Sequence, residues 1–216
     1  MTQYSLVTGA NRGIGAALLQ RMTGRGAAIG TARLGAGDLV ALDVTDPASV
    51  TAMAAGLDGA PVELLVCNAG VYLDRGAELE TGYAVDLWAQ TFAANVTGVF
   101  LTVQALLPNL RAAKTAKIAI ISSQMASHTR APGGSYIYRA SKAAALNLGR
   151  NLASDLVADG IAVGIYHPGW VQTDMGGAAA DLTMDESADG LMARFDDLSM
   201  DSTGCFKTWD GRDHAY

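Results

Sequence analysis

The chain has 216 residues, half of them hydrophobic, and a formal net charge of −6. This length and composition suit one globular domain, so we expect residues 1–216 to fold as a single unit. The negative charge argues against nucleic acid and anionic membranes as partners, because both attract clustered lysine and arginine. The sequence shows no targeting segment and no apolar run near the ~18 residues of a membrane span, so the cytoplasm is the expected compartment.

The two cysteines, Cys67 and Cys205, stand alone in the sequence. Neither has the CxxC spacing of a metal knuckle, and two thiols are too few for a disulfide framework. We therefore expect both to be reduced packing residues, and we expect no metal site.

Short apolar runs rich in valine and isoleucine alternate with stretches of helical spacing along the chain. The predicted strands cover residues 3–8, 26–31, 38–43, 62–67, 117–122, 161–166 and 203–208. This alternation predicts an α/β fold of the Rossmann type, with a doubly wound parallel sheet of about seven strands flanked by helices. In such folds ligands bind beyond the carboxyl ends of the strands.

Two helix starts are predicted from capping patterns, one at Asp46-Pro47 and one at Thr183 with Glu186 three residues later. Only residues 32–37 separate the second and third predicted strands, which is too few for a helical crossover. Either this connection is an irregular loop or the strand boundaries are wrong.

The sequence TGANRGIG, residues 8–15, joins the first predicted strand to the first predicted helix. Gly9, Gly13 and Gly15 have the spacing GxxxGxG, which differs from the GxGxxG of the standard dinucleotide fingerprint. Glycines here permit positive φ, close approach of main-chain N–H groups to a pyrophosphate, and a helix amino end that faces the phosphates. The spacing alone also fits a plain turn.

The sequence SYIYRASKAAALN, residues 135–147, places Tyr138 and Lys142 four positions apart, so on a helix both side chains project from one face. A neighbouring ammonium stabilises a phenolate, so we expect a pKa for Tyr138 below its usual value of about 10. Tyr138 could then act as general acid for a carbonyl oxygen or general base for an alcohol. Such pairs also occur on ordinary exposed helices, so the surrounding residues decide.

Several motifs resemble those of the short-chain dehydrogenase/reductase family and follow in the expected order over nearly the whole chain. They are TGANRGIG, the NAG segment at 68–70, the YxxxK pair, and HPGWVQT at 167–173. The stretches GGSYIYRASKAAALN and HPGWVQTDMGG and the tail GCFKTWDGRDHAY are similar to the carbonyl-reductase branch that includes the sniffer and C-factor types. The resemblance implies an oxidoreductase that transfers hydride between NADP(H) and a small ketone, aldehyde or alcohol.

The motifs and the resemblance together name the candidate site residues. The implied catalytic residues are Asn95, Ser123, Tyr138 and Lys142. The implied cofactor-binding residues are Gly9, Asn11, Arg12, Gly13, Ile14, Gly15, Arg33, Asp43, Val44, Asn68, Ala69, Gly70, Tyr138, Lys142, Pro168, Gly169, Val171 and Thr173. Met125, Trp170 and Met175 are candidates for an apolar substrate pocket, and residues 174–181 for a flexible lid over it.

The resemblance also implies roles for these residues. In the family an asparagine at the position of Asn95 kinks its helix and anchors a water that relays protons to the lysine. A serine after the fifth strand holds the substrate carbonyl. Strand alternation lets only one of Ser122 and Ser123 meet Tyr138, and we choose Ser123 although its spacing to the tyrosine is longer than usual. His167 adjoins the PG motif, but the family uses no histidine there.

The end of the second predicted strand favours NADP(H) over NAD(H). Arg33 follows this strand, no carboxylate occurs before Asp38, and Arg12 lies in the glycine loop. An acidic residue would bind the ribose hydroxyls of NAD and repel a 2′-phosphate, whereas arginine binds that phosphate with charge-assisted hydrogen bonds.

Two other functions fit parts of the sequence. A dinucleotide-sensing regulatory protein could keep the fold without catalysis, but all four catalytic candidates are present. An epimerase or dehydratase of the extended branch usually has a longer carboxyl-terminal domain and a TGxxGxxG loop. The helices that carry Asn95 and Tyr138 pack between subunits in many relatives, so we expect a homodimer or homotetramer acting on a small molecule.

Overall fold

The computed structural model describes residues 2–216. Seven strands form one sheet in the order β3-β2-β1-β4-β5-β6-β7, and neighbouring strands pair in parallel. The strands are β1 (Tyr4–Val7), β2 (Ala28–Ala32), β3 (Val40–Ala41), β4 (Val62–Cys67), β5 (Ala116–Ile121), β6 (Ile161–His167) and β7 (Phe206–Thr208). The strand order runs outward in both directions from β1 and β4, which confirms the predicted doubly wound fold.

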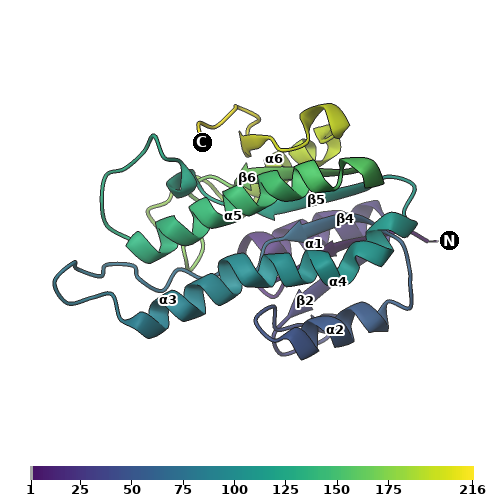
Figure 1. Ribbon diagram of the computed structural model, residues 1–216, viewed down its shortest axis with the longest axis horizontal. Helices are drawn as coiled ribbons and strands as arrows, with labels where there is room; N and C mark the ends of the chain where they lie inside the picture. Colours follow the sequence, from purple (N-terminus) through teal and green to yellow (C-terminus); the bar gives the residue numbers. More distant parts are fainter. Residues whose placement is uncertain (1) are drawn as a thin grey trace.

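Helices cover both faces of the sheet (Figure 1). One face carries α1 (Gly13–Arg25) and α6 (Met184–Asp197), and the other carries α2 (Pro47–Gly56), α4 (Gly98–Ala112) and α5 (Tyr136–Asp155). A further helix, α3 (Val85–Phe92), continues into α4 through the π-helical turn η1 (Ala93–Thr97). Successive strand residues point to opposite faces, so Ile165 packs in the core beneath α4 and α5 while Tyr166 packs beneath α1 and α6.

The connection between β2 and β3 is an irregular loop over residues 33–39, so of the two possibilities for this segment the loop is the correct one. The paired part of β3 is only two residues long, shorter than predicted. β7 is also shorter than predicted, because Met200–Ser202 forms the 3-10 turn η4 and Gly204 turns the chain at a φ of +81°. The other five strand boundaries agree with the prediction to within about two residues.

Both predicted helix starts are present. Asp46 Oδ1 accepts a hydrogen bond from Ala48 N at 3.0 Å, with Pro47 in the first turn of α2. At the start of α6, Thr183 Oγ1 accepts from Glu186 N at 3.2 Å, and Glu186 Oε2 accepts from Thr183 N at 2.9 Å. This reciprocal pair is the predicted capping box.

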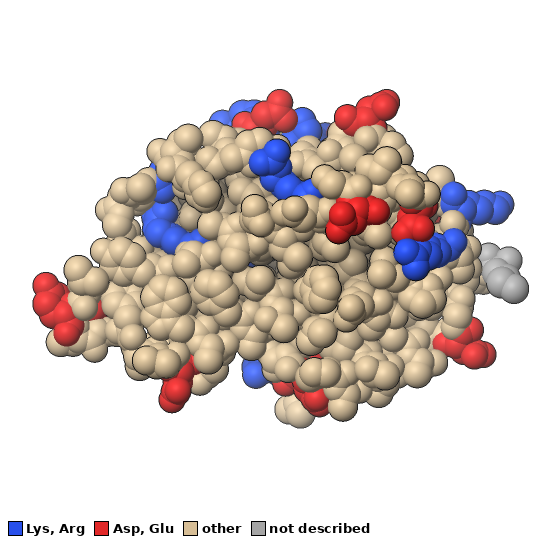
Figure 2. All heavy atoms as spheres, in the orientation of Figure 1, with Lys and Arg blue, Asp and Glu red and all other residues tan. Residues whose placement is uncertain are grey.

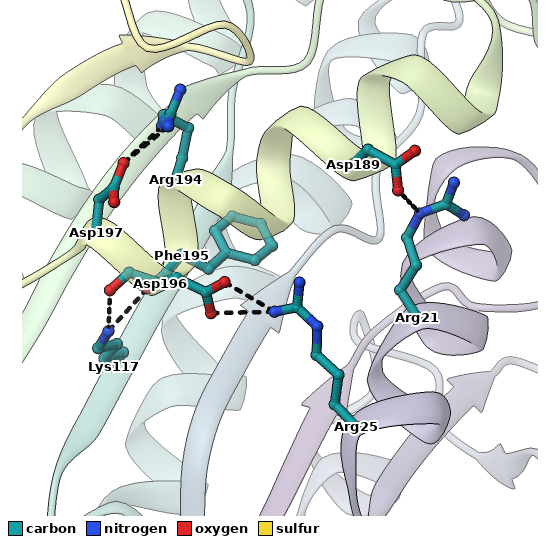
Figure 3. Close-up of polar contacts among 8 residues, drawn as sticks. All are labelled: Arg21, Arg25, Lys117, Asp189, Arg194, Phe195, Asp196 and Asp197. Carbon is teal, nitrogen blue, oxygen red and sulfur yellow. Dashed lines mark hydrogen bonds and ion pairs between the residues drawn. The ribbon is translucent and has the colours of Figure 1, made fainter.

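Ion pairs and a hydrogen bond from Lys117 connect α6 to α1 and β5 (Figure 3). Arg21 on α1 lies 2.5 Å from Asp189 on α6, and Arg25 lies 2.8 Å from Asp196. Lys117 on β5 donates to the main-chain oxygen of Asp196 at 2.8 Å and so satisfies a carbonyl at the end of α6. These contacts connect α6 with both α1 and β5.

The continuous helical stretch Val85–Ala112 has a mean hydropathy of 1.3 over its most apolar window, enough by length and composition to cross a membrane. In the structure 44% of that window is buried within the protein. Val99, Val103 and Leu106 belong to the core over the sheet, which accounts for the apolar composition of this stretch.

Candidate active site

The predicted site residues meet at the carboxyl edge of the sheet, because parallel strands all end at the same edge. The glycine loop follows β1, the NAG segment follows β4, Ser122 and Ser123 follow β5, and the PG motif follows β6. The amino-terminal half of α5 brings Tyr138 and Lys142 to the same edge.

The glycine loop has a conformation that depends on its three glycines. Gly9 and Gly13 have φ values of +68° and +57°. A Cβ on Gly15 would lie 2.2 Å from Gly9 O, so only glycine permits this packing of helix on loop. No side chain caps the start of α1 at Arg12, and the first turn has no acidic residue. The main-chain N–H groups there are thus free of side-chain acceptors and fit the phosphates of a dinucleotide.

Asn68 of the NAG segment connects the glycine loop to the end of β4 by hydrogen bonds. Its Nδ2 donates to Thr8 O at 2.9 Å and to Gly9 O at 3.1 Å. In return, the Thr8 hydroxyl accepts from the main-chain N–H groups of Asn68 and Ala69, both at 3.0 Å. Thr8, which opens the TGANRGIG stretch, is thus a structural residue that the motif pattern alone does not identify. The four hydrogen bonds hold the two loops at a fixed spacing.

Asn95 lies in the π-helical turn η1, as the expected kink requires, and is 1% exposed. Its Oδ1 accepts from Val71 N at 2.8 Å, and its Nδ2 donates to Val71 O at 2.9 Å and to Ser141 Oγ at 2.9 Å. A Cβ on Gly70 would lie 2.9 Å from Asn95 Oδ1 and 3.5 Å from Lys142 Nζ. The side chain therefore connects the segment after β4 to α5, close to the lysine.

The two serines after β5 have different surroundings. Ser122 Oγ, 2% exposed, donates to Lys142 O at 3.1 Å and so attaches β5 to α5. Ser123 faces Tyr138, where its hydroxyl lowers the pKa of the phenol, and its Oγ also accepts from Met125 N at 3.1 Å. Ser123 is thus the serine that meets the tyrosine, and Ser122 holds the helix that carries it.

Tyr138 and Lys142 are both buried on the same face of α5, with 7% and 6% of their surfaces exposed. Lys142 Nζ lies 5.7 Å from the centre of the Tyr138 ring and donates to Ile121 O at 2.9 Å. Burial raises the pKa of Tyr138, and the Ser123 hydroxyl opposes part of that increase. The predicted lowering of this pKa is wrong, because loss of water around the phenol outweighs an ammonium that makes no hydrogen bond to it. Burial also lowers the pKa of Lys142 to about 8.

Two residues that sequence analysis missed hold Tyr138 in place. The Tyr72 ring stacks on the Tyr138 ring with centroids 4.2 Å apart and planes inclined by 22°, and its hydroxyl lies 2.5 Å from Ser135 Oγ. The Asp74 carboxylate, 1% exposed, accepts from the main-chain N–H groups of Ile137 at 2.8 Å and Tyr138 at 3.2 Å. Asp74 thus caps α5, since the helix has no side-chain cap of its own at Ser135.

The charged residues expected near the adenosine end lie beside β1, β2 and β3. Arg33 is exposed directly after β2. Asp43 Oδ1 accepts from the Thr45 hydroxyl at 2.7 Å and from Thr45 N at 2.9 Å, and these bonds, together with the charge of Arg33, lower the pKa of Asp43. Arg12 is exposed, and its Nη1 lies 2.5 Å from Asp174 Oδ2 in the loop after β6.

Three further predicted cofactor residues lie around the same edge. Asn11 is exposed in the glycine loop, and Ile14 is half-buried against the core beneath α1 and α6. Val44 is buried, and a Cβ on Gly98 would lie 2.8 Å from its Cγ2, so glycine lets α4 approach it closely.

A β-bridge connects the PG motif after β6 to the segment before α6. Gly169 has a φ of +90°, and a Cβ there would lie 2.2 Å from Leu182 Cδ1. Val171, 3% exposed, forms a parallel β-bridge with Leu182. Pro168 is buried, and its main-chain oxygen accepts from Ser187 Oγ on α6 at 2.7 Å. The segment that the family resemblance places beside the nicotinamide therefore rests on α6.

Thr173 lies between the PG motif and the glycine loop. Its Oγ1 accepts from Gly176 N at 3.0 Å, and a Cβ on Gly13 would lie 3.5 Å from its Cγ2. This contact places the loop after β6 directly over the start of α1.

The candidate substrate residues lie around the phenol. Met175 Sδ is 4.0 Å from the Tyr138 hydroxyl. Trp170, 45% exposed, donates from Nε1 to Gly176 O at 2.9 Å, and Met125 is half-buried in the turn that follows Ser123. The first two side chains belong to the loop after β6, so this loop forms much of the apolar surface near Tyr138.

Neither cysteine lies in this constellation. Cys67 is buried at the end of β4, where burial raises the pKa of its thiol to about 12, and Cys205 is partly buried beside β7. Within residues 2–216, no three His, Cys, Asp or Glu side chains are placed to hold a metal ion.

Comparison with known proteins agrees with this geometry. Residues 3–182 match the family model for short chain dehydrogenases. The chain is 38% identical over 152 residues to C-signal of Myxococcus xanthus, covering 70% of this chain and 90% of that protein. It is 34% identical over 223 residues to 1-hydroxy-2-glutathionyl-2-methyl-3-butene dehydrogenase of Rhodococcus sp. (strain AD45), covering 95% and 96%.

Solved structures show the same fold over the full length. The NADPH-bound carbonyl reductase from chicken fatty liver superposes with a TM-score of 0.90 at 32% identity, covering 100% of this chain and 99% of that one. The carbonyl reductase Sniffer of D. melanogaster gives 0.92 at 24% identity, with both chains fully covered. These findings confirm the resemblance to the carbonyl-reductase branch. The chain belongs to the short-chain dehydrogenase/reductase family of oxidoreductases.

Proposed function

We propose that the protein is an NADP(H)-dependent carbonyl reductase that uses Tyr138 as its general acid. The observation that carries this proposal is the convergence of Ser123, Tyr138 and Lys142 at the carboxyl edge of the sheet, beside a glycine loop whose helix start has no side-chain cap. The similarity to an NADPH-bound carbonyl reductase supports it. The reaction is reduction of a small ketone or aldehyde, or oxidation of the corresponding alcohol.

NADPH, when bound, supplies the hydride. The Ser123 hydroxyl orients the substrate carbonyl, and Tyr138 donates a proton to its oxygen. Burial keeps Tyr138 protonated at neutral pH, which is the form that reduction requires. Lys142 lies behind the phenol with a lowered pKa of about 8, so it is protonated at neutral pH and can supply a proton to Tyr138 after the reaction.

NADP(H) preference is part of the proposal. Arg33 is exposed after β2, and the next carboxylate along the chain is Asp38. A guanidinium in this position attracts a 2′-phosphate and makes no specific contact with the ribose hydroxyls of NAD. Replacement of Arg33 by alanine should raise the KM for NADPH at least tenfold and leave the KM for NADH within about twofold, because one charge-assisted hydrogen bond contributes about 1.5–3 kcal/mol.

The test is NADPH oxidation over a panel of small ketones and aldehydes, together with cofactor binding followed by fluorescence. The variant Tyr138→Phe should bind NADPH with unchanged Kd and lose at least 10³-fold in kcat, an effect on the order of general acid catalysis. Tyr136→Phe is the matched control, since Tyr136 is 40% exposed on the same helix. Retained turnover in Tyr138→Phe would remove the phenol from its role. Cofactor binding without turnover of any carbonyl would instead favour the dinucleotide-sensing function.

We also propose that the chain forms homo-oligomers through the face that carries α3, α4 and α5. Charged side chains are sparse on this face over α3 and α4 (Figure 2). Large apolar side chains are exposed on these helices, with Val85 at 81%, Trp88 at 37%, Phe100 at 41% and Tyr136 at 40%. Contiguous exposed apolar surface is typical of protein interfaces. Light scattering should show a dimer or tetramer that Phe100→Glu dissociates, and a monomeric parent protein would refute this.

A further inference from the structure

A hollow of about 270 Å³ lies at the carboxyl ends of β5, β6 and β7. Gln124 and Arg130 line it from the segment after β5, and His167 lines it from the end of β6. Arg212, Asp213 and His214 line it from the segment after β7. Two arginines, two histidines and one carboxylate, that of Asp213, therefore surround one small hollow of a protein whose net charge is −6.

The positive charge around the hollow is not fully neutralised. Arg212 pairs with Asp210 at 2.8 Å, and Lys207 pairs with Asp213 at 2.7 Å, so each of these two carboxylates already has a cation. Arg130 forms no ion pair within residues 2–216, and its Nη1 donates to the neutral amide of Gln124. The guanidinium of Arg130 is thus available for an anionic ligand.

His167 lies among the same positively charged side chains. The residue is 8% exposed, and its Nδ1 is buried without a hydrogen-bond partner in the described part of the chain. Burial, together with the charges of His214, Arg130 and Arg212, lowers the pKa of His167 to about 4, and only Asp210 among the main contributors opposes this. A buried polar group without a partner costs free energy unless a ligand or water satisfies it.

The hollow adjoins the catalytic residues on the side away from the adenosine end. Gln124 directly follows Ser123, and His167 directly precedes Pro168 of the PG motif, so each wall begins ~3.8 Å along the chain from a site residue. Arg33, at the predicted 2′-phosphate site, follows β2 on the opposite side of β1 and β4. The hollow is therefore separate from the positions that hold cofactor phosphates.

We propose that this hollow binds the anionic end group of the carbonyl substrate, a carboxylate or phosphate, while the reacting carbonyl lies at Tyr138 and Ser123. Arg130 provides the charge-assisted hydrogen bonds, and Arg212 and His214 line the same hollow as further hydrogen-bonding groups. The substrate class is thus a keto or aldehyde acid, or a phosphorylated carbonyl compound. This inference rests on the proposed reductase function.

The first experiment measures kcat/KM for keto acids of increasing chain length and for the primary amide of each. The acid should be preferred at the chain length that spans the distance from Tyr138 to Arg130. Arg130→Gln should lower the acid-to-amide ratio of kcat/KM about tenfold, and Arg130→Lys should restore part of it. Lys114→Gln is the matched control, since it removes one positive charge before β5, at the opposite edge of the sheet, and should leave the ratio unchanged.

The second experiment detects the anion without turnover. Acetate and inorganic phosphate are titrated at constant ionic strength while the ring resonances of His167 and His214 are followed by NMR. A saturable shift of these signals, lost in Arg130→Gln and kept in Lys114→Gln, supports the site. The stronger of the two probes identifies carboxylate or phosphate as the end group.

The two experiments separate failure of the subsite from failure of the reductase function. Reduction of neutral carbonyls, with no preference for acids and no saturable shift of the histidine signals, would overturn the anion subsite and leave the reductase function intact. Saturable anion binding without reduction of any carbonyl would overturn the reductase function and retain the anion site.

Discussion

Removal of the Asp74 carboxylate is expected to destabilise the protein at the start of α5. In Asp74→Ala the main-chain N–H groups of Ile137 and Tyr138 lose the acceptors that lie 2.8 and 3.2 Å away, in a site where Asp74 is 1% exposed. Loss of a helix cap costs about 0.5–2 kcal/mol, and a buried donor without an acceptor costs about 1–3 kcal/mol. We therefore expect a loss of about 3 kcal/mol, or roughly 6–12 °C in Tm for a chain of this length.

The assay is equilibrium urea unfolding at pH 7, followed by circular dichroism. Asp74→Asn keeps one acceptor oxygen and should lose about half as much free energy as Asp74→Ala. Asp38→Ala is the control, because Asp38 is exposed and exposed substitutions usually change stability by less than about 0.5 kcal/mol. If Asp74→Ala is also within about 0.5 kcal/mol of the parent protein, water or another group replaces the carboxylate, and the argument from the cap is refuted.

Three further predictions follow from buried groups. Lys142→Met should raise the free energy of unfolding at pH 7 by about 1–3 kcal/mol and abolish turnover, since burial lowers the pKa of Lys142 from 10.5 to about 8. Between these two pH values unfolded chains bind the proton that the folded protein has released, so parent stability should rise with pH, and urea unfolding of Lys142→Met should lack that rise. Gly15→Ala should abolish NADPH binding measured by fluorescence, because the Cβ would lie 2.2 Å from Gly9 O, whereas Gly24→Ala on the same helix meets no atom within 4 Å and should be neutral or stabilising. Burial lowers the pKa of His167 from 6.5 to about 4, so its contribution to stability is lost as pH falls through this interval, and His167→Gln should flatten the measured acid unfolding curve there.

Residues whose roles depend on their sequence neighbours could be predicted from the sequence. Asp46 caps its helix through a main-chain N–H two positions later, and Gly13 needs its positive φ for a turn that joins adjacent elements. Tyr138 and Lys142 share a helix face because of their spacing alone. The parallel sheet follows from the alternation of strand and helix patterns, so the carboxyl edge could be predicted as the place where these loops meet.

Features that depend on distant segments could not be predicted. Asp74 caps a helix that begins more than 60 residues later, and no local pattern connects the two. The burial of Tyr138, which reverses the expected direction of its pKa shift, depends on packing by Tyr72 and by Met175 from separate loops. The choice between two neighbouring serines likewise depended on the position of α5 relative to β5.

The bridge between Val171 and Leu182 has a consequence for the segment between them. Gln172 N donates to Leu182 O at 2.8 Å, and Leu182 N donates to Trp170 O at 3.1 Å, so the chain is already closed at the base of residues 173–181. This pairing separates residues 173–181 from β6 and α6, so a change in their conformation need not disturb either element. Because Met175 Sδ lies 4.0 Å from the Tyr138 hydroxyl, we expect a change in this segment to alter access to the phenol.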